Sequence, residues 1–170
     1  MRWDKITEKQ NPVSERIDQK STQEILEIIN NDDIGIADAV AEALPDIQRF
    51  IDALIVRFQH GGKLFYIGSG TSGRLGVLDA AECPPTYSTD PEMIQGIIAG
   101  GYEGLVRSIE GAEYIPNDGA KAVLKYGVTK KDALLGITAS SSTPFVLGSL
   151  EKAKNINALT GLLICNEPIE

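Results

Sequence analysis

Two clusters of glycine and hydroxyl residues stand where the chain could bind an anion. The first, Gly68-Ser69-Gly70-Thr71-Ser72-Gly73, follows an apolar run, and the second, Ser140-Ser141-Ser142-Thr143, follows another at residues 132–138. A helical pattern comes after each cluster, so each is expected to join a strand to a helix. A helix N-terminus offers unpaired N–H groups and a partial positive charge, which suit a phosphate or carboxylate.

Both clusters also have simpler interpretations, which stay open. A Ser or Thr before a helix commonly caps that helix. The GxGxxG spacing also occurs in dinucleotide sites, but no acidic residue ends the second expected strand to bind a ribose, and no Walker A lysine follows. Arg74 could bind the anion or pair with Asp79. The predicted binding residues are Ser69, Gly70, Thr71, Ser72, Arg74, Ser140, Ser141 and Thr143.

Strands and helices alternate after residue 62. Short apolar runs predict strands at 63–68, 93–100, 132–140 and 159–166, and helical patterns lie at 71–82, about 103–113, 117–124 and 143–155. Such alternation, with strands apolar on both faces, indicates an α/β fold: a doubly wound parallel sheet with helices on both faces. Both clusters then share the carboxyl edge of the sheet, where ligands bind in such folds.

An N-terminal helical segment is expected to precede this sheet. After an irregular arm, Ser21 or Thr22 can cap a first helix; a second covers about 36–43, and a third runs from Pro45 to His60 before Gly61-Gly62. His60 is expected to be a helix-end residue. The predicted domains are 1–60, the arm and helices, and 61–170, an α/β domain. We expect this domain to be truncated, because the chain stops directly after a strand.

Composition argues against several functions. The net charge is −8 over 170 residues, whereas nucleic acids and anionic membranes require a basic surface. No apolar run approaches a membrane span, and the first residues carry no signal-peptide core. Two cysteines and one histidine provide no disulfide framework and no metal signature. We therefore expect a cytoplasmic, metal-free protein with no nucleic-acid or membrane partner.

Three segments resemble the N-acetylmuramic acid 6-phosphate etherases of the sugar isomerase (SIS) family, in their N-terminal part. These segments are GSGTSGRLGVLDAAECPPTY, IAGGYEGLVRSIEGAE and ITASSSTPFV, and the resemblance runs from about residue 5 to the end. It implies an SIS-type domain at 61–170 and a dimeric bacterial enzyme of cell-wall recycling. Such an enzyme cleaves the D-lactyl ether of its phosphosugar substrate without a cofactor.

The resemblance implies two catalytic glutamates, Glu82 in AAECPPT and Glu113 in EGAE. Ether cleavage by elimination needs a base at C2 and an acid at the leaving oxygen. Glu82 is expected at the negative end of a helix, which favours a protonated carboxyl group and hence the acid. Glu113 is then the base, and Glu110, three residues earlier on the same expected helix, is the alternative.

Some features disagree with active etherases. The second cluster carries Ser141 and Ser142 where the related enzymes have Gly and Arg, so one anion contact is missing. Related glucokinase regulatory proteins bind fructose phosphates without catalysis, and phosphosugar isomerases use the same fold. A non-catalytic phosphosugar-binding module is therefore the alternative function.

Cys83 lies beside Glu82, but no histidine accompanies it as a base, so a packed side chain is the simpler interpretation.

Overall fold

Four parallel strands form one sheet in the computed structural model, which describes residue 7 and residues 9–166. The strands are β1 (Leu64–Gly68), β2 (Ile94–Ile98), β3 (Ala133–Ile137) and β4 (Leu159–Leu163). Their order is β2-β1-β3-β4, with every neighbouring pair parallel. All four predicted strands are confirmed, each slightly shorter than its apolar run.

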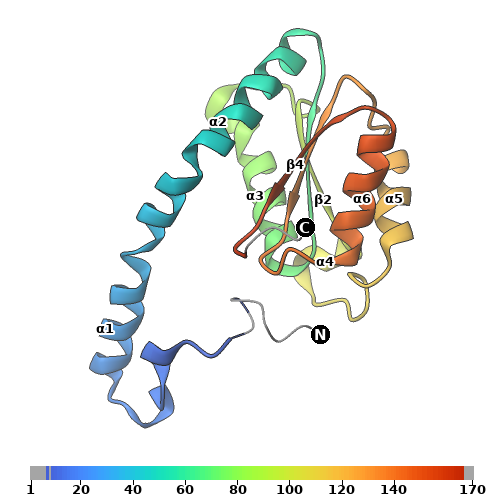
Figure 1. Ribbon diagram of the computed structural model, residues 1–170. Coiled ribbons are helices and arrows are strands. Elements are labelled where there is room, and N and C mark those ends of the chain that lie inside the picture. Colours follow the sequence, from blue (N-terminus) through green and yellow to red (C-terminus); the bar gives the residue numbers. More distant parts are fainter. Residues whose placement is uncertain (1–6, 8, 167–170) are drawn as a thin grey trace. The chain divides into compact units, whose positions relative to one another are not determined.

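Helices cover both faces of this sheet, as Figure 1 shows. Helix α3 (Gly70–Tyr87) packs on one face, while α5 (Pro116–Lys125) and α6 (Pro144–Asn155) pack together on the other side. The face toward α6 holds the main core, in which Phe65, Ile67 and Leu134 are almost fully buried. The predicted doubly wound α/β fold is therefore confirmed.

Helix α3 lies close to its face because small residues line the contact. A Cβ on Gly76 would lie 2.7 Å from Cβ of Tyr66, and a Cβ on Gly96 would lie 2.5 Å from a Val77 methyl carbon. Gly73 is equally confined, since a Cβ there would lie 2.7 Å from the Gly68 carbonyl oxygen. The turn from β1 into α3 is thus tight, and Gly73, the last residue of the first cluster, packs directly against the end of β1.

The strand order creates a switch point between β1 and β3. From β1 the chain passes through α3 to β2 on one side, then returns across the other face to β3 and continues to β4. The connections that leave β1 and β3 therefore diverge to opposite faces and leave a crevice between their carboxyl ends. Both hydroxyl clusters stand at this edge of the sheet.

The chain divides into two compact units, residues 1–51 and 52–170. In the first, short 3-10 helices at Pro12–Ser14 and Ile17–Gln19 precede α1 (Thr22–Asp33). Ser21 caps α1 through a complete capping box with Glu24, as predicted. The predicted domain boundary between residues 60 and 61 stays a prediction. Residues 1–6 and 8 of the expected arm, and the chain end at 167–170, lie outside the described residues.

Helix α2 (Ile36–Gln59) is continuous where the sequence pattern predicts two helices. Pro45 lies inside it, so the proline does not start a new helix. Proline removes one backbone donor, but the apolar positions on both sides of Pro45 keep helical spacing, and the helix continues through it. At its end, Gly62 N–H donates to the Arg57 carbonyl and Gly61 takes a positive φ of 75°, which confirms the predicted glycine ending.

Two other helix predictions were wrong. Helix α3 passes through Pro84 and Pro85 and ends at Tyr87, where Ser88 adopts a left-handed φ of 55°. The helix expected at about 103–113 is only one turn, α4 (Glu103–Val106), and irregular backbone follows until α5 begins. The residues in this irregular stretch line the candidate site, where the cause of its early ending is found.

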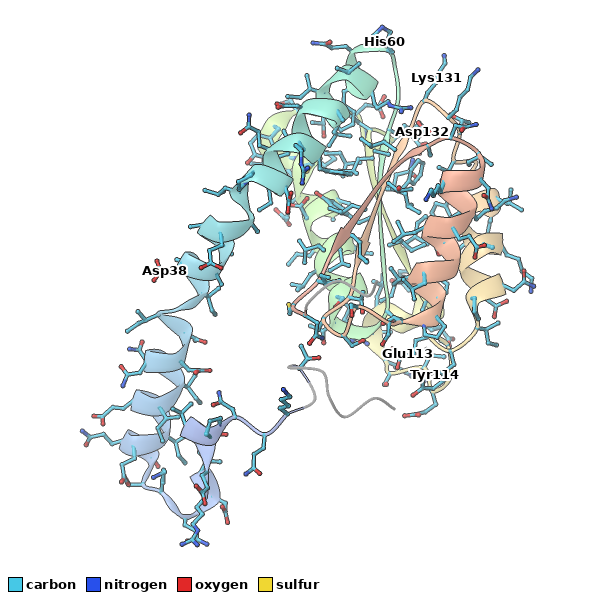
Figure 2. The ribbon with its side chains drawn as sticks, in the orientation of Figure 1. Asp38, His60, Glu113, Tyr114, Lys131 and Asp132 are labelled. Carbon is cyan, nitrogen blue, oxygen red and sulfur yellow. The ribbon has the colours of Figure 1, made fainter. Side chains whose placement is uncertain are left out.

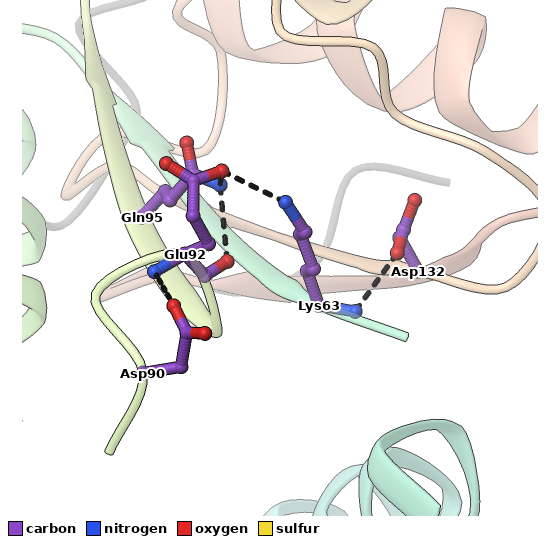
Figure 3. A network of polar contacts seen from close by, with 5 residues as sticks. All are labelled: Lys63, Asp90, Glu92, Gln95 and Asp132. Carbon is purple, nitrogen blue, oxygen red and sulfur yellow. Dashed lines mark hydrogen bonds and ion pairs between the residues drawn. The ribbon is translucent and has the colours of Figure 1, made fainter. Parts of the chain in front are cut away.

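A polar network joins three strands at their amino ends, opposite the crevice (Figure 3). The buried Asp132 carboxylate accepts hydrogen bonds from Lys63 N–H at 2.8 Å and from the N–H and hydroxyl of Thr129 at 2.7 and 2.8 Å. Lys63 Nζ also pairs with Glu92, just before β2, at 2.8 Å. Asp132 thereby ties the start of β1 to the start of β3.

Replacing Asp132 by Ala is expected to destabilise the fold by about 2–3 kcal/mol, because three donors lose a charged acceptor. Urea unfolding followed by circular dichroism measures the change. Asp118→Ala is the matched control: it removes an exposed pair with Lys121 and is expected to cost only a few tenths of a kcal/mol. Equal losses in the two variants would contradict the structural role of Asp132.

Candidate functional site

A pocket of about 310 Å³ opens at the carboxyl end of the sheet. Residues after β1, after β2 and in the irregular 107–114 segment form its walls. Figure 2 shows Glu113 and Tyr114 at this end of the sheet, with Lys131 and Asp132 at the opposite end. The polar side chains that line it are Ser69, Arg74, Arg107, Ser108, Glu110, Glu113 and Tyr114.

Glu113 is held at both of its ends. The Ser69 hydroxyl donates to Oε2 of Glu113 at 2.9 Å, and the Phe145 N–H, in the first turn of α6, donates to the Glu113 carbonyl at 3.0 Å. Its other carboxylate oxygen has no hydrogen bond within the described part of the chain. The structure thus fixes this half-buried carboxylate at the switch point and leaves one oxygen for a ligand.

Ser69 therefore does not serve as a simple cap. It occupies the N-cap position of α3, yet its side chain makes no capping hydrogen bond. The same holds for Thr143 at the N-cap of α6. The capping alternative is wrong for these two hydroxyls. Gly70, the next residue, lines the pocket with a positive φ of 52°, whereas Thr71 and Ser72 follow in the first turn of α3 and lie outside the lining.

Arg74 accounts for the early end of the helix expected at 103–113. Its Nε donates to the Leu105 carbonyl at 3.0 Å and its Nη2 donates to the Arg107 carbonyl at 2.9 Å. A longer helix would need those two carbonyls for its own next turn. Arg74 lines the pocket, but two of its donors hold the backbone of the pocket wall, and it forms no pair with Asp79.

The second cluster forms a loop whose hydroxyls engage one another. Thr138 and Thr143 hydroxyl oxygens lie 2.7 Å apart, and the Ser141 hydroxyl donates to the Ser140 carbonyl at 2.6 Å. Ser141 is buried with a left-handed φ of 60°, a conformation that favours glycine. None of these residues lines the pocket, but the Phe145 bond to Glu113 connects the end of the loop to the pocket wall.

Glu82 does not meet Glu113 within one chain. It is exposed on α3, twelve residues after Gly70, which corresponds to about 18 Å along the helix axis. Because α3 continues to Tyr87, Glu82 also lies more than one turn before the helix end, beyond the range of the expected end effect. The structure therefore brings five predicted residues together in the pocket lining: Ser69, Gly70, Arg74, Glu110 and Glu113. Glu82 lies farther along α3, outside this group.

Sequence reasoning missed Arg107 and Ser108 as pocket residues. Both lie in the 103–113 segment, for which the sequence pattern predicts a helix. On a helix, the side chains of two consecutive residues point in different directions and would not line one pocket together. The one local signal was the helix-breaking Gly111, which takes a positive φ of 79°. The set of residues that line the pocket depends on the two long-range hydrogen bonds from the Arg74 side chain to the Leu105 and Arg107 carbonyls.

Three side chains outside the pocket behave as packed or helix-end residues. Cys83 is buried in α3, and burial, with the nearby Asp79 carboxylate as a smaller cause, raises the pKa of its thiol. Burial and a hydrogen bond to Asp79 likewise raise the pKa of Tyr66. His60 is exposed at the end of α2, and its Nδ1 hydrogen-bonds the Val56 carbonyl at 2.7 Å, as expected of a helix-end residue.

The family profile of the glucokinase regulatory protein N-terminal SIS domain matches residues 46–154. The chain belongs to this SIS domain family. Among solved structures, this SIS domain is similar to phosphoheptose isomerase GmhA from Neisseria gonorrhoeae, with a TM-score of 0.62 and 17% identity over 85% of this chain and 75% of the isomerase. A phosphoheptose isomerase from Francisella tularensis gives a TM-score of 0.57 at 21% identity, covering 82% of this chain and 74% of that one. These two similarities concern the fold.

Curated relatives of this SIS domain are named N-acetylmuramic acid 6-phosphate etherase. The protein from Salinibacter ruber is 48% identical over 167 residues, which cover 98% of this chain and 54% of the relative. The protein from Aliivibrio fischeri (strain MJ11) is 48% identical over 161 residues, or 95% and 54% of the two chains. The resemblance to the etherases is thus confirmed, and the chain spans about half the length of these relatives.

Within residues 7 and 9–166 the SIS domain chain has no helix long and apolar enough to cross a membrane. The same residues include no group of three or more His, Cys, Asp or Glu side chains placed to hold a metal ion.

Replacing Arg74 by Ala is expected to loosen the pocket wall, because the Leu105 and Arg107 carbonyls lose their charged donors. Amide hydrogen exchange of residues 103–107, read by mass spectrometry, should accelerate about tenfold or more. Arg74→Lys should accelerate it by a smaller factor, since an ammonium cannot reproduce the fixed fork of donors. The β3 peptide is the internal control. Unchanged exchange at 103–107 would show that Arg74 does not hold this wall.

Cys83 is expected to resist alkylation. Because the raised pKa leaves less thiolate at a given pH, and the side chain is buried, iodoacetamide at about pH 8 should modify exposed Cys165 at least about tenfold faster. Peptide mass spectrometry over time measures both rates in one sample. In guanidinium the two rates should converge. Equal rates in the folded chain would make Cys83 an accessible thiol and reopen a nucleophilic role for it.

Proposed function

We propose that this chain contributes the phosphosugar site of a cytoplasmic, cofactor-independent lyase that cleaves the D-lactyl ether of N-acetylmuramic acid 6-phosphate. The products are D-lactate and N-acetylglucosamine 6-phosphate, in the recycling of cell-wall amino sugars. One observation carries the proposal: the Glu113 carboxylate stands in a pocket at the carboxyl end of the sheet, fixed by Ser69 with one oxygen free. The names of the curated relatives support the choice of substrate.

The chemistry follows from the position of the ether. In the open-chain sugar the C3–O bond lies β to the aldehyde. Glu113 removes the C2 proton, the electron pair forms the enolate, and the C3–O bond breaks as the leaving oxygen takes a proton from an acid. Water then adds at C3 of the unsaturated aldehyde, which restores the saturated sugar. The base and the acid must stand close to neighbouring carbons of one sugar.

The phosphate is proposed to lie at the two hydroxyl clusters. Ser69, Gly70, Thr71 and Ser72 begin α3, and Ser140, Ser141 and Thr143 precede α6, so two helix N-termini face the crevice. The helices that follow the two clusters cover opposite faces of the sheet, so a phosphate between the clusters can meet both helix N-termini. Arg74 contributes charge to this site while its donors hold the pocket wall.

The acid is proposed to come from a second copy of the chain. Glu82 lies about 18 Å along α3 from the start of the helix, so it cannot act on a sugar held beside Glu113 of the same chain. In a twofold symmetric dimer each chain can present α3 to the pocket of the other, and each pocket then receives one Glu82 and one Glu113. Glu110, which lines the same pocket as Glu113, is the acid available within one chain.

A second candidate function is phosphosugar binding without chemistry. The matched family profile describes a regulatory protein domain. The resemblance to the etherases also implies an arginine at the position where this chain has Ser142. This candidate keeps the proposed phosphate site and needs neither glutamate. Release of D-lactate separates the two candidates, because only the lyase produces it.

Mixing two inactive variants tests the lyase and its shared site together. Glu82→Gln and Glu113→Gln should each lower D-lactate release about 10²- to 10⁴-fold, because each removes one proton-transfer group. Mixed and allowed to exchange subunits, they should recover about a quarter of the parent activity, since half of the dimers are hybrids with one intact site. A coupled D-lactate dehydrogenase assay measures the rates.

Glu110→Gln is the matched control and should retain activity. If Glu110→Gln abolishes lactate release while Glu82→Gln does not, the site lies within one chain. If the parent binds the phosphosugar and releases no lactate, the binding module is the correct function.

A further inference from the structure

Arg107 has a fixed backbone and a free side chain. Its N–H donates to the Glu103 carbonyl at 2.9 Å, and its carbonyl accepts from Arg74 at 2.9 Å. Arg107 is an exposed residue of the pocket lining, and its guanidinium makes no hydrogen bond or ion pair with the residues that the structure describes. An arginine whose backbone is anchored on both sides, with all its side-chain donors unused, is prepared to bind a planar anion.

An anion that enters the pocket meets charges of both signs. Arg74 and Arg107 provide two positive charges, and Glu110 and Glu113 provide two negative ones. A second carboxylate placed beside Glu113 is repelled unless a cation with free donors meets it. Arg74 donates to two carbonyls, so Arg107 is the cation of this pocket with a whole guanidinium to offer.

The place of Arg107 separates it from the proposed phosphate site. The proposed phosphate site lies where β1 and β3 end, whereas Arg107 lies in the pocket wall that follows β2 and α4. Strands are about 4.8 Å apart, so the ends of β2 and β3 are separated by about 10 Å. We place the C2–C3 side of a sugar whose 6-phosphate occupies the crevice between β1 and β3 near Glu113 and Arg107, because both residues line the adjoining pocket.

We propose that Arg107 binds the lactyl carboxylate of the substrate and thereby distinguishes the ether from its de-lactylated product. This inference rests on the proposed function. The lactyl group is attached to C3, the carbon next to the one that Glu113 deprotonates, so its carboxylate must enter the same pocket. A guanidinium binds a carboxylate through two parallel hydrogen bonds, which suits this planar anion.

The experiment compares two ligands that differ in the lactyl group alone. Isothermal calorimetry measures the Kd of N-acetylmuramic acid 6-phosphate, with the Glu113→Gln background preventing turnover, and of N-acetylglucosamine 6-phosphate. Arg107→Ala should weaken binding of the first about 10- to 100-fold and leave the second unchanged, because one charged bidentate contact is lost. Arg107→Lys should weaken the first by a smaller factor.

Lys154→Ala, at the end of α6, is the matched control for the loss of one positive charge and should change neither affinity. The melting temperature of Arg107→Ala should equal that of its parent, because the side chain has no partner to lose among the described residues. Equal weakening of both ligands would assign Arg107 to the phosphate and overturn the inference. Unchanged binding of both would overturn it as well.

The same measurements separate this inference from the proposed function. If the chain binds both sugars, Arg107→Ala affects only the lactyl ligand, and the chain with its native Glu113 releases no lactate, the inference stands and the lyase proposal fails. If that chain releases lactate and Arg107→Ala leaves the preference between the ligands unchanged, the lyase stands and the inference fails. If the parent binds neither sugar, both are overturned.

Discussion

The candidate site depends on Glu113 being fixed at both ends. Its carboxylate accepts from Ser69 at the end of β1, and its carbonyl accepts from Phe145 at the start of α6. These two hydrogen bonds join segments that belong to opposite sides of the switch point. A carboxylate held this way loses little further conformational freedom when a ligand arrives, which is the condition for efficient proton transfer.

The wall that carries Glu113 is irregular because Arg74 makes it so. By binding the Leu105 and Arg107 carbonyls, Arg74 supplies the donors that the next helical turn would have supplied. The chain from 107 to 115 is then free to curve around a pocket, and Glu110, Glu113 and Arg107 converge on it. The same arginine thus ends a helix, shapes a cavity and contributes charge to it. The proposed direct contact with an anion belongs to Arg107 instead.

The sequence predicted those features that depend on local pattern and on burial. The four strands, the capping box at Ser21, the glycine ending of α2 and the doubly wound sheet all follow from apolar spacing and turn residues. The helix start at Pro45 and the helix end at residue 82, just before Pro84-Pro85, were predicted wrongly, because proline weakens a helix locally while packing along the whole helix decides whether it continues. The 103–113 segment failed for another reason: its backbone partner, Arg74, lies about thirty residues away, and no local pattern reports such a bond.

Helix α3 carries the two ends of one sequence motif to different places in the chain. The first turn of α3 stands at the pocket of its own chain, whereas Glu82, about three turns later, stands outside it. Close spacing in a sequence block therefore says nothing about convergence in one chain, since a helix separates its residues by about 1.5 Å each along a straight axis. If both glutamates act on one sugar, the geometry of a single chain leaves association as the physical route, and activity then depends on how tightly two copies bind.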